Sequence, residues 1–389
     1  MTGISIDETE PRLITDTAGL KAAVDQASQQ PAVPLDLEGN SFHRYPESVC
    51  LVQMATRDDV YLIDPLAIED MSPLGSLLDD PRLVKLLHSA DYDVRSLDRE
   101  WKFRVANLFD TSIAASFIGI EQTGLANVLK EVLNVDIPKH KKLQRADWTV
   151  RPLSDALIEY AASDVLHLVP LYELLTRRLN ELGRSSWVQE ECDRLAQVRY
   201  SKPDLTTAFL SVKGSKDLDS RGLATLKSLT DFRELEARRI GRPHFRVMPD
   251  ATLVALAQNP RADLKMLSGV GRFARQPLVE GLRQALREGA NAPPVRRPAA
   301  QAPTYRPSRA ERERAKLRLK LLKDWRVSHG KRLSLAPPLL WPTVSLERLA
   351  REQSTAEEEL SSGEVRDWQR SEFAGSLAKT ARSLSSSGT

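Results

Sequence analysis

The sequence predicts an α/β domain with a mixed central sheet flanked by helices, followed by all-α helical domains. In the first half, short apolar runs alternate with segments of helical periodicity, whereas only helical periodicity follows Trp187. The chain has 389 residues, 41% of them hydrophobic and 28% charged. This composition is typical of a globular protein, and the length predicts two or three domains.

Charge divides the chain into two unlike halves. Residues 1–202 contain 22 Lys and Arg against 32 Asp and Glu, a balance of −10, while the remainder holds 34 against 21, a balance of +13. A basic C-terminal half can bind a polyanion, or its helices can simply have solvated basic faces. The sequence shows neither a membrane-spanning run nor a signal peptide, so we expect a cytoplasmic protein. Its two cysteines are too few for a disulfide framework.

The elements of the first half follow in order. A short helix is predicted over 20–30 and the first strand over 33–38. The apolar runs 49–54 and 60–64 flank a polar turn and predict a hairpin, in which Cys50 is a small core residue. Residues 83–88 predict a strand, or the end of a helix running into one, and precede a helix that Ser89 or Asp91 could cap. A short strand over 108–111 precedes a helix from Ile113.

The first strand carries the stretch Leu35-Asp36-Leu37-Glu38. Side chains alternate along a strand, so Leu35 and Leu37 should enter a core while Asp36 and Glu38 share the opposite face. Two neighbouring carboxylates repel each other unless a cation neutralises them or water reaches them. The pair therefore fits either a metal site or the polar face of a half-exposed strand.

A helix over 154–166 carries a second pair of polar residues. Ser154 is a suitable N-cap, and alanine and leucine fill the helix interior. Tyr160 and Asp164 are four residues apart and so project from the same face. This pair could belong to a catalytic site or form a surface hydrogen bond.

Taken together, these stretches resemble the DEDD 3′→5′ exonucleases of the tyrosine subgroup, and most closely the ribonuclease D family. The resemblance rests on Asp36-Leu37-Glu38, on residues 88–93 (HSADYD) and on residues 160–164 (YAASD). Residues 62–66, 109–111 and 145–153 also look like that family. The resemblance implies a ribonuclease-H-like exonuclease domain over residues 1–200.

Carried over by position, the resemblance implies that Asp36, Glu38, Asp93 and Asp164 are metal ligands and that Tyr160 positions the attacking water. Asp36 would bridge two ions, Glu38 and Asp164 would complete the first, and Asp93 would support the second. The family spacing selects Asp93 over Asp91, which we assign to the helix cap or the surface. The further residues expected to contact RNA are Gln53, His88, Arg145, Arg151, Arg238 and Arg239. His88 could equally be a buried core histidine.

Phosphodiester hydrolysis explains why such a site needs carboxylates. Two divalent ions roughly 4 Å apart can activate water, stabilise charge on the phosphate and hold the leaving oxygen. Hard oxygen ligands favour Mg²⁺ or Mn²⁺ over zinc. Four crowded carboxylates repel one another without metal, so we expect at least one raised pKa in the metal-free site.

The C-terminal half predicts two helical domains. Residues 203–290 look like the HRDC domain that ribonuclease D shares with RecQ helicases, with Arg238 and Arg239 on an amphipathic helix over 223–239. Residues 291–308 are rich in Pro and Ala and predict a linker. Residues 309–380 resemble a second, more divergent copy, and their dense Arg and Lys residues favour binding to a phosphate backbone.

We therefore expect a metal-dependent 3′→5′ exoribonuclease that releases nucleoside 5′-monophosphates. Family resemblance suggests a monomer that trims the 3′ ends of tRNA precursors and other small structured RNAs. One alternative is a DNA exonuclease of the same fold, because the motifs do not distinguish ribose from deoxyribose. Another is an RNA-binding scaffold with an inactive site, against which the presence of all five motif residues argues.

Overall fold

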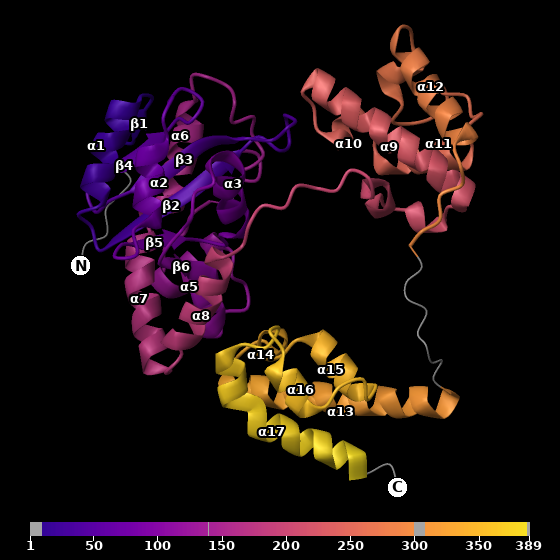
Figure 1. Cartoon of the computed structure of the whole chain (residues 1–389). Coiled ribbons are helices and arrows are strands. Elements are labelled where there is room, and N and C mark those ends of the chain that lie inside the picture. Colours follow the sequence, from indigo (N-terminus) through magenta and orange to yellow (C-terminus); the bar gives the residue numbers. More distant parts are fainter. Residues whose placement is uncertain (1–9, 139, 299–307, 387–389) are drawn as a thin grey trace.

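The computed structural model describes residues 10–138, 140–298 and 308–386, and Figure 1 shows an α/β domain followed by two helical domains. Six strands form one sheet in the order β1-β4-β3-β2-β5-β6. Their bounds are β1 (Arg12–Ile14), β2 (Ala32–Gly39), β3 (Val49–Ala55), β4 (Val60–Ile63), β5 (Val84–Leu87) and β6 (Leu108–Asp110). In the part of the chain that the structure describes, no helix is long and apolar enough to cross a bilayer.

The sheet is mixed, as predicted. Strand β2 pairs with β3 antiparallel and with β5 parallel, and β3 forms the predicted hairpin with β4. Strand β1 was not predicted; it is a three-residue edge strand, parallel to β4, and its Arg12 and Leu13 are exposed. The strand with Asp36 and Glu38 therefore lies inside the sheet.

Helices cover both faces of the sheet. One face packs on a core that includes Leu20, Leu35, Leu74 and Leu97, and α6 packs across β2, β3 and β4 on the other face. The helices of this domain are α1 (Thr17–Ala27), α2 (Ser72–Asp79), α3 (Asp91–Trp101), α4 (Thr111–Phe117), α5 (Leu125–Leu133), α6 (Asp155–Leu166), α7 (Leu168–Glu181) and α8 (Ser185–Ala196). Helix α2 was not predicted.

One buried carboxylate organises the starts of two helices. Asp110 accepts hydrogen bonds from the backbone N–H of Ser89 and Ala90 before α3, at 3.1 and 2.8 Å. It also accepts from Ser112 and Ile113 in α4, at 2.8 and 3.2 Å. The prediction that Ser89 or Asp91 caps α3 was wrong: Ala90 occupies the N-cap, and the cap comes from a residue distant in sequence. Asp91 is a surface residue paired with Arg95.

The first helical domain packs around its longest helix. Its helices are α9 (Ser220–Ile240), α10 (His244–Val247), α11 (Asp250–Gln258) and α12 (Leu278–Asn291), and α12 and α11 both pack on α9. The loop that follows β2 contacts this domain, because the Tyr45 hydroxyl donates to the Glu234 carboxylate at 2.8–2.9 Å. The Tyr45 ring also lies 4.5 Å from the His244 ring, centroid to centroid. Within the predicted linker, residues 299–307 lie outside the described residues.

The second helical domain repeats details of the first. Its helices are α13 (Arg309–Leu333), α14 (Pro337–Leu340), α15 (Thr343–Ala350), α16 (Ala356–Ser361) and α17 (Asp367–Ser386). Arg233 in α9 donates to the carbonyl of Met248, 15 residues later, and to the carboxylate of Asp250, 17 residues later. Arg326 in α13 donates to the carbonyl of Trp341 and to Thr343 at the same two spacings. This supports the predicted second copy, which stays a prediction.

The second helical domain shares a core with the α/β domain. Trp368 stacks on Trp187 of α8, with 4.7 Å between ring centroids, and meets Phe117 of α4 edge-on. The guanidinium of Arg366 pairs with Glu191 at 2.9 Å. Glu190 accepts from the backbone N–H of Asp367 and Trp368, so a carboxylate of the α/β domain caps the start of α17. The second helical domain is thus fixed on the α/β domain by apolar and charged contacts.

Candidate active site

Strand β2 places the first two carboxylates as the sequence predicted. Leu35 and Leu37 are buried, at 2% and 7% exposure, while Asp36 and Glu38 point to the other face of the sheet. The register with β3 shifts between Glu38 and Gly39. A Cβ on Gly39 would lie 2.4 Å from the Tyr92 hydroxyl, so a side chain at this position would displace the Tyr92 ring that lines the site.

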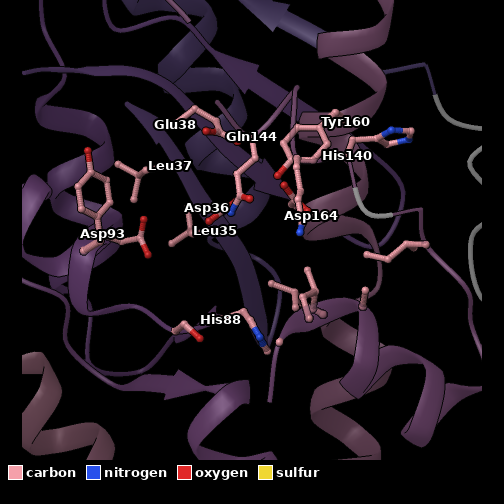
Figure 2. A pocket seen from close by; sticks show the side chains of 18 of the residues that line it. Leu35, Asp36, Leu37, Glu38, His88, Asp93, His140, Gln144, Tyr160 and Asp164 are labelled. Carbon is pink, nitrogen blue, oxygen red and sulfur yellow. The ribbon is translucent and has the colours of Figure 1, made fainter. Parts of the chain in front are cut away.

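Helix α6 brings Tyr160 and Asp164 over the same face. Its apolar side buries Ala161, Ala162 and Val165 against the sheet, which fixes the rotation of the helix. The side chains of Tyr160 and Asp164 are hydrogen-bonded to each other and point toward Asp36 (Figure 2). Ser154 sits at the N-cap as predicted, but its side chain makes no capping hydrogen bond.

Three carboxylates converge in this site. One oxygen from each of Asp36, Glu38 and Asp164 lies within 4.8 Å of the other two. Asp93, 5% exposed on α3, stands outside this group and lies across the strand from Asp164 (Figure 2). Converging carboxylate oxygens are the ligands that Mg²⁺ and Mn²⁺ prefer, so the residues present fit a divalent metal ion.

Without a bound cation, burial and mutual repulsion raise the pKa values of the carboxylates in the site. Withdrawal from water, and then repulsion by Asp164 and Asp93, raises the pKa of Glu38 to about 9. Burial raises the pKa of Asp93 to about 7, with a contribution from the charge of Asp110, and burial raises that of Asp164 to about 6. The pKa of Asp36 is raised by burial and by the three other carboxylates. The expected raised pKa values are therefore present.

These residues form part of a cavity of about 490 Å³. Much of its wall was not predicted, and this part comes from the starts of α3 and α5 and from the segment between α5 and Trp148. These additional lining residues include Ser89, Tyr92, Gly124, Ile137, His140, Lys141 and Gln144. A run of His and Lys at 140–142 was the available signal, but without periodicity it could not be placed beside the carboxylates.

Three of the residues expected to contact RNA are His88, Arg145 and Gln53. His88 lines the cavity, with its Nδ1 2.8 Å from the Thr111 hydroxyl. Arg145 is exposed, and its guanidinium lies over the Phe42 ring. Gln53 is paired with Asp36 in the β2–β3 register but has no exposed surface, so a direct contact with RNA does not fit its position.

The other three arginines have partners within the protein. Arg151 forms an ion pair with the buried Asp64 at 2.5 Å and donates to the carbonyls of Cys50, Trp148 and Val150. Arg151 is therefore held within the fold by these contacts, and its contact with RNA stays a prediction. Arg238 pairs with Glu234 and Arg239 with Glu236 on α9, so binding to RNA would compete with these ion pairs.

Comparison with known proteins agrees with this geometry. Residues 11–180 match a 3′-5′ exonuclease family, and residues 222–279 match the HRDC domain. Ribonuclease D of Gluconacetobacter diazotrophicus is 36% identical over 283 residues, which are 71% of this chain and 71% of that protein. Ribonuclease D of Granulibacter bethesdensis is 33% identical over 88% of this chain and 86% of that protein.

A solved structure extends the likeness of the fold to nearly the whole chain. The crystal structure of Escherichia coli RNase D superposes with a TM-score of 0.69 at 23% identity, covering 97% of this chain and 99% of that one. At this identity the likeness concerns the fold, while the two bacterial relatives establish the family. The chain therefore belongs to the ribonuclease D family and is a 3′-5′ exoribonuclease.

Proposed function

We propose that this exoribonuclease releases nucleoside 5′-monophosphates from the 3′ ends of tRNA precursors and other small structured RNAs. Hydrolysis would depend on two divalent ions, Mg²⁺ or Mn²⁺. The observation that carries the proposal is the convergence of Asp36, Glu38 and Asp164 beneath Tyr160 in one cavity. The solved RNase D of E. coli is described as an exoribonuclease involved in structured RNA processing, which favours this substrate class. We expect a cytoplasmic protein, and the family resemblance suggests a monomer.

The residues of the site would have different roles. Asp36, Glu38 and Asp164 would hold one cation, and Asp93 together with Asp36 would hold the other. Bound cations supply a water of lowered pKa and neutralise charge on the phosphate. Burial and the nearby carboxylates raise the pKa of Tyr160, so its hydroxyl keeps its proton and can orient the attacking water through a hydrogen bond.

The test is hydrolysis of 5′-labelled substrates by the purified chain. A tRNA with a 3′ extension and a DNA oligonucleotide of matching sequence would be incubated with Mg²⁺ or with EDTA, alongside Asp36→Asn. We expect stepwise shortening of the RNA only, lost in EDTA and in the variant. Asp36→Asn should still bind the RNA, because it removes one metal ligand and leaves the fold intact.

The other outcomes decide between the alternatives. Shortening of both substrates would favour a nuclease that does not distinguish RNA from DNA. Tight, salt-sensitive binding without shortening would mean an RNA-binding protein with an inactive site. Equal hydrolysis by Asp36→Asn and the natural chain would exclude catalysis at these carboxylates.

A further inference from the structure

Helix α13 carries a row of basic side chains along one face. The row consists of Arg309, Arg312, Lys316, Lys320 and Lys323, and we call it the α13 basic stripe. Successive members are three or four residues apart, which places them on one side of a helix. All five are exposed, and no ion pair joins any of them to another described residue. The stripe thus carries a net positive charge that no ion pair within the described part of the chain neutralises.

The fold fixes the direction of this stripe. Leu322 and Trp325, on other faces of α13, are buried in the domain core. Arg318 pairs with Glu352 of the same domain. A capping box between Ser308 and Glu311 holds the first turn. Figure 1 shows the N-terminal part of α13 extending beyond α14, α15 and α16, so solvent surrounds it there.

The stripe also stands in a fixed relation to the active site. Arg184, which precedes α8, donates to the carbonyls of Phe117 and of Leu333, the last residue of α13. The stacked Trp187 and Trp368 and the ion pair of Arg366 with Glu191 hold the same two domains together. A ligand held by the stripe would therefore be held at a constant distance from the carboxylates.

We propose that the α13 basic stripe binds the phosphate backbone of a double-helical stem in the RNA whose 3′ end enters the active site. This rests on the proposed function. Residues 309–323 hold seven Lys and Arg against two Asp and Glu, whereas residues 1–202 carry a balance of −10. The net positive charge that attracts a polyanion therefore lies in the part of the chain after residue 202. The stripe spans about 21 Å, with one cation about every 5 Å.

The form of the stripe favours duplex RNA over other anionic ligands. Single-stranded sites use aromatic side chains on which bases stack, and the stripe contains none. A helix that lies on a membrane inserts a broad apolar face, but in α13 Leu322 and Trp325 pack in the domain core, which leaves Leu317, Leu321 and Val327 as its exposed large apolar residues. A rigid row of cations instead complements the regular backbone of a stem.

The test compares two variants that lose equal charge. K316Q/K320Q/K323Q removes three members of the stripe, and K21Q/R177Q/R178Q removes three exposed cations from α1 and α7. Binding of a hairpin with a 3′ tail, and of the tail alone, would be measured in the Asp36→Asn background so that the RNA stays intact. For the stripe variant we expect at least about tenfold weaker hairpin binding and a salt slope smaller by about 2.7. Tail binding should be unchanged.

Several results would overturn the proposal. Equal losses in the two variants would show an effect of net charge alone, and unchanged hairpin binding would remove the site. Loss of binding to phosphatidylserine vesicles with hairpin binding retained would assign the stripe to a membrane. Circular dichroism would verify folding. Hydrolysis of the tail alone by the unsubstituted chain tests the proposed function separately, because that substrate contains no stem.

Discussion

Tyr160 lies against Asp164, and in the proposed function its hydroxyl orients the attacking water and would hold no metal ion. Tyr160→Phe should therefore lower kcat by about 100-fold, the range expected when one positioned proton-handling group is lost. Binding of Mn²⁺ should be unchanged, since the carboxylates of the site remain. Calorimetric titration with Mn²⁺ and single-turnover hydrolysis would separate these effects. If Tyr160→Phe also lost affinity for Mn²⁺, a role of Tyr160 limited to orienting the attacking water would be contradicted.

The raised pKa values of the site also predict how stability depends on pH. In the metal-free protein, Glu38 and Asp93 keep their protons to about pH 9 and 7, whereas both titrate near pH 4 when unfolded. The folded state then binds more protons, so its free energy of unfolding should fall by a few kcal/mol between pH 5 and 8. Urea denaturation in EDTA would measure this fall.

Metal provides the control for that measurement. In the proposed function, Mg²⁺ would bind the folded state and neutralise the deprotonated carboxylates, so the fall with pH should shrink when Mg²⁺ replaces EDTA. Glu38→Gln should make stability in EDTA depend less on pH, because the substitution removes the carboxyl whose pKa is raised to about 9. Stability that rises with pH in EDTA would contradict the account.

At the scale of elements, Asp110 couples α3 to α4. Asp110→Ala would leave four backbone N–H groups without their acceptor, and losing a helix cap costs about 1 kcal/mol at each start. We expect a loss of about 2–4 kcal/mol in urea denaturation. Activity should also fall, because α3 carries Asp93. Asp110→Asn keeps one acceptor oxygen and should lose less; equal stability of the alanine variant and the natural chain would disprove the double cap.

The sequence predicts those elements that are determined by their own residues and misses those that depend on distant residues. Strand β2 and helix α6 have strong periodicity, so the faces that carry Asp36, Glu38, Tyr160 and Asp164 could be predicted from the sequence alone. The cap by Asp110 depends on residues 20 positions away, and a three-residue edge strand such as β1 carries too little pattern. The turn with His140 and Lys141 has no periodicity, so its place in the cavity wall could not be predicted.

At the scale of the whole molecule, Trp368 joins the second helical domain to the nuclease domain. It is 4% exposed and packs on Trp187 and Phe117. Trp368→Ala should cost about 3–5 kcal/mol, the usual loss for a buried aromatic side chain. The C-terminal domain should then become sensitive to protease, while tail hydrolysis persists. Trp368→Phe is the matched control, and an unchanged protease pattern in the alanine variant would argue against this junction.

The two indole rings at that junction give the protein an optical reporter of its own. Trp187 and Trp368 belong to different domains, and their ring planes are inclined by only 21° at a centroid distance of 4.7 Å. Chromophores this close couple electronically, so the pair should contribute a circular dichroism band that disappears when the domains separate. Movement of the C-terminal domain during RNA binding could then be followed in real time, without attaching a dye.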